Sequence, residues 1–351
     1  AMDGYAVVSA DTVGASARSP VRLRVVGDLP AGRVPAGAVR PGTAVRIMTG
    51  APVPDGADAV VMVEDTTTAA DEVSIRREAR PGENVRDAGE DIRAGDLLLT
   101  PGTYLRPAHV GICAVAGRPD VLVYGVPTVA VVSTGDEVVD PGEPLLPGKI
   151  RNSNLYTLVA QVTEAGARVH SACHVPDEPE ALRRALAAAA AADVVVTSGG
   201  VSVGDYDLVK EILAEEGQVE FWKVAMKPGK PMAFGRLRGK PMFGLPGNPV
   251  SSMVTFEVAV RPALRKMMGH LRLLRPEVSA TLLAPLRHKP GRREFVRAVT
   301  TFGGGGCETR ATGDQGSGIL TSMLRANSLI IVPEEAADVP ASETVTVALL
   351  E

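Results

Sequence analysis

Residues 177–200, DEPEALRRALAAAAAADVVVTSGG, predict the fold of the central part of the chain. The alanine- and leucine-rich half has the charged, amphipathic pattern of a helix, and the three valines that follow form a short apolar run typical of a buried strand. The same alternation surrounds this stretch, with a strand and loop at 128–138 (TVAVVSTGDEV), a helix expected over 152–169 and a long helix expected from Pro249. Strands that alternate with helices indicate a parallel sheet covered on both faces.

The flanking regions have a different character. Residues 1–92 contain short β-branched runs between Gly and Pro, and residues 271–351 contain further short strands without helices. We therefore expect a multidomain α/β plus β protein. Its parts are a β-rich N-terminal domain (1–92), a linking segment with a short strand and a helix entered through Pro107 (93–125), a doubly wound, mostly parallel α/β domain (126–270) and a small C-terminal β-barrel (271–351).

Composition excludes several classes of protein. The net charge is −4 and aromatic residues make up 3% of the chain, so neither a general nucleic-acid field nor a base-stacking platform is indicated. No apolar run is long enough to span a bilayer, so we expect no membrane partner. Three widely spaced cysteines exclude a disulfide framework, and we expect a reducing, cytoplasmic location.

Ligands of open α/β sheets bind beyond the carboxyl ends of the strands. In this chain that rule selects four loops, at 133–137, 197–207, 227–231 and 244–252. Two of them combine small donors suited to an anion with carboxylates suited to Mg²⁺. A tight strand-to-helix turn capped by Asp207 would explain the glycines equally well, and Asp136 could simply cap a turn. The donors are Ser133, Thr134, Gly135, Ser198, Gly199, Gly200, Ser202 and Gly204, and the acids are Asp136, Glu137, Asp205 and Asp207.

The other two loops add positive charge and a helix start. Lys223, Lys227 and Lys230 surround one Pro-Gly turn, and the first two are spaced to share a face if the strand continues through them. Single exposed lysines usually serve solvation, but three beside an anion loop indicate anion binding. Asn248 and Pro249 begin the long helix, either as a second anion site or as an ordinary capped start.

Eight separated motifs occur in one order along the chain, and together they resemble the MoeA family, which includes the E domain of gephyrin. They are AMDGYAV, IMTGAPVP, NVRDAGEDI, AVVSTGDEV, IRNSN, VVTSGGVSVGDYD, WKVAMKPGKP and GLPGNPVSSMVTF. The resemblance covers essentially the whole chain and is looser over the last part. It implies a central domain like the small molybdopterin-binding (MogA/MoaB-like) proteins. It also implies a molybdopterin molybdenumtransferase, which takes molybdate and adenylylated molybdopterin, inserts the metal and releases AMP with Mg²⁺.

The resemblance also implies roles for single residues. It places Asp3, Asp177, Glu137, Asp207, Lys223 and Lys227 in the catalytic cleft. The expected metal-binding acids are Glu137, Asp91, Asp205 and Asp207, of which Glu137 and Asp207 are expected to lie nearest the metal and the pyrophosphate. An N-cap of a helix over 178–192 is the alternative role for Asp177. Substrate contacts are expected from Thr49, Lys230, Pro246, Gly247, Asn248, Pro249 and the small donors of the first two loops.

The resemblance further implies a homodimer, the pterin and molybdate as small-molecule partners, and a transient contact with an upstream adenylyltransferase. The family has an additional segment ahead of AMDGYA, so we expect part of the linking domain to be missing from this chain. Two other functions remain open. One is a non-catalytic molybdopterin-binding scaffold, which would lack acids or lysines in its cleft. The other is a molybdopterin adenylyltransferase, which would not need the flanking domains.

Overall fold

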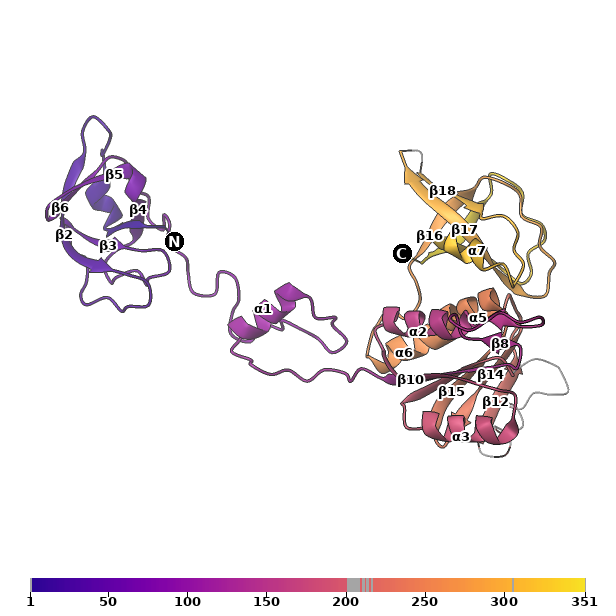
Figure 1. The fold of residues 1–351 in the computed structure, drawn as a ribbon. Helices are drawn as coiled ribbons and strands as arrows, with labels where there is room; N and C mark the ends of the chain where they lie inside the picture. The colour runs from indigo at the N-terminus through magenta and orange to yellow at the C-terminus, as the bar shows by residue number, and fades with distance from the viewer. Residues whose placement is uncertain are drawn as a thin grey trace. The chain divides into compact units, whose positions relative to one another are not determined.

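The computed structural model describes residues 2–200, 209, 212, 215, 217–304 and 306–350. The chain forms two compact units, Ala1–Leu98 and Leu99–Glu351, each of which is described by itself (Figure 1). Within the described residues, no helix is both long and apolar enough to cross a membrane.

The first unit is built on a six-stranded sheet in the order β4-β1-β3-β2-β6-β5. All four residues of β1 are buried, because successive side chains of a strand point to opposite faces and here both faces are covered. Tyr5 and Val7 enter one apolar cluster, and Ala6 enters another. The strands are β1 (Gly4–Val7), β2 (Val21–Leu29), β3 (Thr43–Ile47), β4 (Ala59–Met62), β5 (Thr66–Ala69) and β6 (Glu72–Ile75).

The second unit contains an α/β sheet in the order β10-β7-β11-β15-β14-β12. The first four strands are parallel, whereas β14 runs antiparallel to both β15 and β12. Because β12 and β15 are both antiparallel to β14, they point the same way, so β12 ends at the same edge as the parallel strands. The strands are β7 (Thr128–Thr134), β10 (Arg168–Val175), β11 (Val194–Ser198), β12 (Gly217–Lys223), β14 (Pro231–Leu237) and β15 (Lys240–Leu245).

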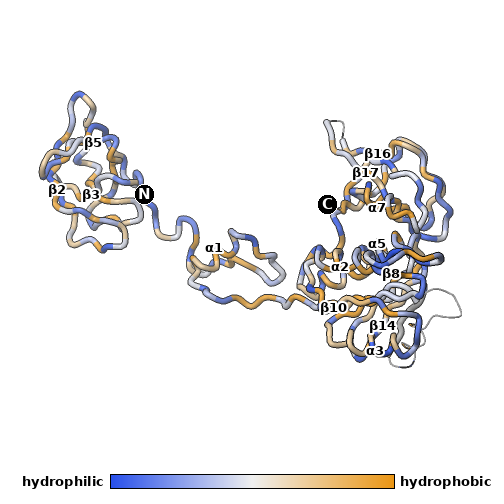
Figure 2. The backbone as a smooth tube through the Cα atoms, viewed as in Figure 1, coloured by the Kyte–Doolittle hydropathy of each residue, from blue (hydrophilic) through white to orange (hydrophobic). Residues whose placement is uncertain are grey.

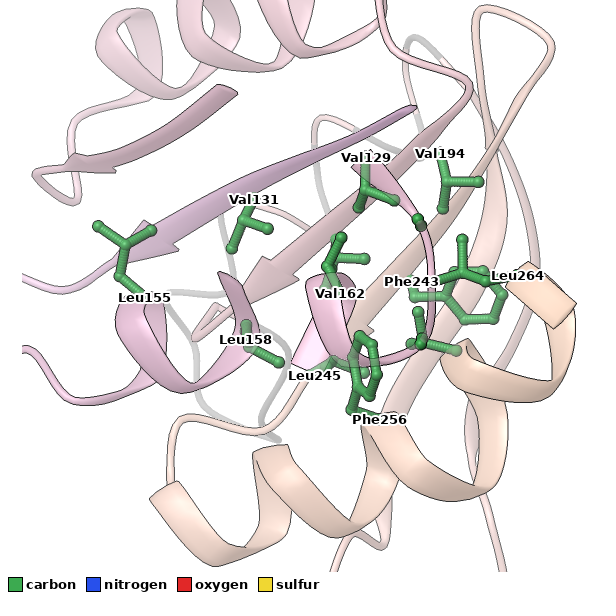
Figure 3. Close-up of a cluster of buried hydrophobic side chains, with 14 of the residues drawn as sticks. Val129, Val131, Leu155, Leu158, Val162, Val194, Phe243, Leu245, Phe256 and Leu264 are labelled. Carbon is green, nitrogen blue, oxygen red and sulfur yellow. The ribbon is translucent and has the colours of Figure 1, made fainter. Parts of the chain in front are cut away.

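Helices cover both faces of this sheet (Figure 1). On one face, Leu158 and Val162 pack with Phe256 against strand residues such as Val131 (Figure 3). On the other, Leu182 and its neighbours form a second apolar cluster. The first face carries α2 (Asn154–Glu164), α5 (Pro249–Thr255), the π-helix η3 (Phe256–Val260) and α6 (Arg261–Met267), and the second carries α3 (Pro179–Ala189).

The C-terminal strands close into a small barrel. The order β17-β18-β16-β20-β19 is completed by direct pairing of β17 with β19, and β13 joins the outside of β17. The barrel elements are β16 (Glu277–Leu282), β17 (Arg293–Gly303), β18 (Gly306–Ala311), α7 (Leu320–Leu324), β19 (Ser328–Val332) and β20 (Thr344–Leu349), with β13 at Met226–Lys227. The expected fold class, a mostly parallel α/β sheet flanked by β-rich parts and a barrel, is confirmed.

Three local expectations were wrong. The helix expected over 152–169 ends at Glu164, because Gly166 takes a φ of +92° that terminates it, and the half-exposed edge strand β10 follows. The segment 93–125 forms α1 (Pro107–Val115) but no strand. Lys223 and Lys227 do not share one strand, since β12 ends at Lys223 and Lys227 belongs to β13.

Candidate active site

A pocket of about 330 Å³ lies where the parallel strands of the α/β sheet end. Strands β7 and β11 supply its centre, since Ser133 and Thr134 end the first strand and Ser198 ends the second. The loop after β15 closes another side with Gly247 and Pro249. Of the small donors and acids predicted from the first two loops, the lining includes Ser133, Thr134, Gly135, Glu137, Ser198, Gly199 and Gly200, together with Asp177.

Glycines allow the loops to approach one another closely. Gly199 has a φ of +95°, and a Cβ there would lie 2.7 Å from Thr134 Oγ1 and 2.9 Å from the Thr134 carbonyl oxygen. Both the conformation and the space therefore require glycine. The N–H of Gly199 donates to the Leu245 carbonyl (3.1 Å), so this amide serves the sheet and is not available to a ligand. The glycine-rich loop thus has a structural role beside any role in anion binding.

Two carboxylates on neighbouring loops hold each other through the backbone. Asp177 N–H donates to Asp136 Oδ1 at 3.0 Å, and Asp136 N–H donates to Asp177 Oδ2 at 3.3 Å. The alternative role of Asp177 as a helix cap is wrong, because the N-cap of α3 is Glu178. Burial, followed by repulsion from the carboxylates of Asp136 and Glu137, raises the pKa of Asp177 above its ordinary value.

The acids of this corner lack an ion-pair partner among the described residues. No ion pair involves Glu137 or Asp177 within the part of the chain that the structure describes. Two nearby cations are used to hold the 136–151 loop instead. Lys149 Nζ donates to the Asp136 carbonyl (2.6 Å), and the Arg151 guanidinium donates to the Asp140 carbonyl (3.0 Å). A cationic ligand beside these acids would relieve their repulsion.

Two asparagines at the start of α2, Asn152 and Asn154, line the pocket; the sequence predicted asparagine caps for this helix but no site role for them. Asn154 Nδ2 donates to Ser198 Oγ (2.8 Å) and to the Gly247 carbonyl (2.7 Å), which joins the start of α2 to the end of β11 and to the loop after β15. Asn152 Oδ1 accepts from Leu155 N–H (3.1 Å) in the first turn of α2, although the N-cap position itself is Ser153. Asn152 Nδ2 is buried and has no partner among the described residues. The pair of asparagines at the start of an amphipathic helix was the sequence signal that could have identified these two residues as part of the site.

The three lysines are placed at the same sheet edge but are not among the described residues that line this pocket. Lys223 is exposed at the end of β12, and Lys230 is exposed in the turn that leads to β14. Lys227 makes an ion pair of 2.7 Å with Glu294 of the barrel. Pro246 is buried and its carbonyl lies 3.4 Å from Ser198 Oγ, whereas Asn248 is exposed and makes no side-chain cap.

Three further predicted residues belong to the first unit. In the first unit, Thr49 N–H donates to Asp3 Oδ1 (2.7 Å), and this backbone hydrogen bond is the main cause that lowers the pKa of Asp3. Asp91 is exposed in the same unit. The described residues contain no group of three His, Cys, Asp or Glu side chains placed to hold one metal ion. Four predicted residues, Ser202, Gly204, Asp205 and Asp207, lie outside the described residues.

Comparison with known protein families finds three matches in order. They are a "MoeA N-terminal region (domain I and II)" over residues 1–117, a "Probable molybdopterin binding domain" over 130–266, and a "MoeA C-terminal region (domain IV)" over 279–350.

Similar proteins extend over nearly the whole chain. Molybdopterin molybdenumtransferase 2 of Mycobacterium tuberculosis is 43% identical over 348 residues, which is 97% of this chain and 85% of that protein. The molybdopterin molybdenumtransferase of Haemophilus influenzae is 38% identical over 351 residues, 99% of this chain and 86% of its own length. A crystal structure of the molybdopterin biosynthesis MoeA protein from Pyrococcus horikosii matches with a TM-score of 0.83 and 35% identity, covering 100% of this chain and 86% of that one. The chain belongs to the MoeA family.

Proposed function

We propose that this chain is a molybdopterin molybdenumtransferase, which inserts molybdate into adenylylated molybdopterin and releases AMP. The observation that carries the proposal is the pocket at the strand ends, which is lined by hydroxyl and amide donors together with the carboxylates of Glu137 and Asp177. It is supported by relatives named for this activity at 36–43% identity over nearly the full chain.

The donors suit the anionic parts of such a substrate. Ser133 and Ser198 are buried hydroxyls at the strand ends, and Asn152 keeps one buried N–H free of any partner among the described residues. An unpaired buried donor is unfavourable by about 1–3 kcal/mol, so an acceptor atom of a ligand would be stabilised there. We assign these three residues to binding phosphoryl or pterin oxygens.

The acids suit a divalent cation. Mg²⁺ is usually bound by one or two carboxylates together with substrate phosphate and water, so a preformed three-carboxylate site is not required. Glu137 and Asp177 fit this demand, because both line the pocket, and burial together with repulsion from the neighbouring acids raises the pKa of Asp177. Bound Mg²⁺ would neutralise charge that develops on the adenylyl phosphate. In our assignment, Glu137 and Asp177 hold this ion and orient the phosphate.

The assay is AMP release from adenylylated molybdopterin with Mg²⁺ and molybdate, comparing the wild type with Glu137→Ala. Glu143→Ala is the matched control, because Glu143 is an exposed carboxylate of the same loop that does not line the pocket. We expect molybdate-dependent release that collapses only in Glu137→Ala. Equal rates in all three proteins would remove Glu137 from the site.

The same experiment separates the two other functions. Tight pterin binding without turnover in the wild type would indicate a scaffold. Transfer of AMP from ATP to molybdopterin by this chain alone would indicate an adenylyltransferase. The three cysteines are free thiols, which agrees with the reducing cytoplasm that we assign to this enzyme.

We also propose that the protein acts as a homodimer. The support is the segment around α1, which contains apolar stretches (Figure 2). No residue of the helix itself is buried. Val115, Leu122 and Val123 are largely or fully exposed, and contiguous exposed apolar patches mark interaction sites. Sedimentation velocity should show a dimer that Leu122→Asp converts to a monomer. Val34→Asp, at an exposed valine of the first unit, should leave the dimer intact.

A further inference from the structure

One segment belongs to two sheets of the second unit. After β12 ends at the pocket edge of the α/β sheet, β13 pairs in parallel with β17 of the barrel, Met226 opposite Arg293 and Lys227 opposite Glu294. Arg293 N–H also donates to the Ala225 carbonyl at 3.0 Å. The chain then turns back through Lys230 into β14 at the same edge. The position of the lysine-bearing turn therefore depends on the barrel.

A buried carboxylate of the barrel holds Lys227. Glu294 Oε1 lies 2.7 Å from Lys227 Nζ, and Glu294 Oε2 lies 2.9 Å from His288 Nδ1. The Glu294 and His288 side chains are 6% and 2% exposed, whereas Lys227 is 46% exposed. His288 is itself fixed, because its backbone N–H donates to Asp338 Oδ1 (2.8 Å). Both oxygens of Glu294 are thus held in place, and the carboxylate gives the ammonium a defined position.

The joint between the sheet and the barrel does not need this ion pair to hold together. Met226, Val250, Val254, Met323 and Leu329 form a buried apolar cluster across the joint. Val250 N–H additionally donates to the Ser317 carbonyl at 3.0 Å. A half-exposed lysine adds little to such a contact, because solvent screens its charge.

We infer that Glu294 is a positioning residue, which fixes the ammonium of Lys227 at the strand-end edge for an oxyanion of the substrate. This inference rests on the proposed function. An ammonium has three N–H donors, and one directed at Glu294 leaves two for a phosphoryl or molybdate oxygen. Holding the long side chain in advance avoids part of the entropy that its immobilisation would lose on binding. The barrel thereby takes part in substrate binding.

The test compares the full-length wild type with Glu294→Gln, Lys227→Met and the double variant, measuring KM for molybdate and for the adenylylated pterin separately from kcat. Glu334→Gln is the matched control, because Glu334 pairs with Arg293, the neighbour of Glu294, but is exposed. We expect Glu294→Gln to raise one of the KM values about threefold to tenfold, a range set by the ordering of one long side chain. In the Lys227→Met background, Glu294→Gln should cause no further rise in KM. Glu294→Asp, which keeps the charge and guards against misfolding of the glutamine variant, should be intermediate.

Several results would overturn the inference. If Glu294 has a purely structural role, Glu294→Gln should lower the melting temperature and leave both KM values unchanged. Alternatively, its effect on KM should add in full to the effect of Lys227→Met in the double variant. A lowered KM would mean that Glu294 merely weakens the lysine as an anion site. If the wild type releases no AMP, the proposed function fails, and calorimetric titration with sodium molybdate decides the role of Glu294. Weaker molybdate binding in Glu294→Gln than in the wild type would then support positioning, and equal or no binding would exclude it.

Discussion

Asp136 and Asp177 hold two loops of the pocket together by exchanging hydrogen bonds, each carboxylate accepting from the other residue's backbone N–H at 3.0 and 3.3 Å. The arrangement is unfavourable for charge. Burial first, and then the negative charges of Asp136 and Glu137, raise the pKa of Asp177. Such repulsion lowers the stability of the folded protein, and destabilising charge arrangements of this kind are common in active sites.

The first prediction concerns this repulsion. A carboxyl whose pKa is raised on folding favours the folded state below its unfolded pKa and disfavours it once it ionises in the folded protein. Asp177→Asn should therefore stabilise the protein at pH 7.5 by about 0.5 kcal/mol, a magnitude typical of screened surface charges. The gain should shrink as the pH falls through the raised pKa of Asp177 and vanish in acid. Thermal unfolding at pH 7.5 and pH 4 measures both values, and AMP release should fall in the same variant. A variant that is stabilised equally at both pH values would contradict the charge argument.

The second prediction concerns Asn154, which is 8% exposed and joins Ser198 to the loop at Gly247. Asn154→Ala leaves a buried hydroxyl and a carbonyl without their donor, so we expect a loss of about 1–3 kcal/mol. Urea unfolding should show a lower midpoint with an unchanged slope. Thr163→Ala is a suitable comparison, since Thr163 Oγ1 only donates back to Val159 within α2 at an exposed position. A shift in Asn154→Ala no larger than in this control would refute the role as a joint.

The third prediction separates backbone strain from steric exclusion at Gly199. Gly199→Ala puts an alanine at a positive φ, which strains the backbone, and also places a Cβ 2.7 Å from Thr134 Oγ1. Gly239→Ala introduces only backbone strain, because the φ of this residue is +81° and no atom lies within 4 Å of the added Cβ. We expect the control to lose about 1 kcal/mol and Gly199→Ala to lose clearly more. Chemical denaturation of the two proteins gives the difference, and equal losses would show that the loop relaxes away from Thr134.

The fourth prediction concerns a partly buried ion pair of the π-helix. Arg275 Nε lies 2.9 Å from Glu257 Oε2, and their side chains are 15% and 6% exposed. Gln161 Nε2 also donates to Glu257 Oε1 at 3.1 Å. Glu257→Ala leaves the partly buried Arg275 with Glu164 as its remaining acidic partner, so we expect a loss of about 1–3 kcal/mol. Glu334→Ala, which removes an exposed partner of Arg293, should leave the unfolding midpoint unchanged. Comparable midpoints for both variants would mean that solvent reaches Arg275.

The elements that the sequence predicted well are those whose pattern of apolar residues follows directly from their burial. The apolar runs of β7 and β11 and the amphipathic α3 are visible in the chain, because a strand covered on both faces must be apolar throughout. The edge strand β10 was missed since it is only partly buried and its composition resembles a helix end. Its start depends on Gly166, whose positive φ ends α2.

For the site, the sequence alone determined that the loops after β7, β11 and β15 meet, because the carboxyl ends of parallel strands share one edge of a sheet whatever the details of packing. The fourth predicted loop, at 227–231, supplies no lining residue of the pocket among the described residues. The sequence could not determine which atoms of those loops form hydrogen bonds or ion pairs with other parts of the protein. Only the tertiary structure decided that Gly199 N–H serves Leu245, that Asn154 joins Ser198 to Gly247, and that Lys227 is held by Glu294 from the barrel. Such pairings join residues far apart in the chain, and their geometry depends on distances of a few tenths of an ångström that local composition does not encode.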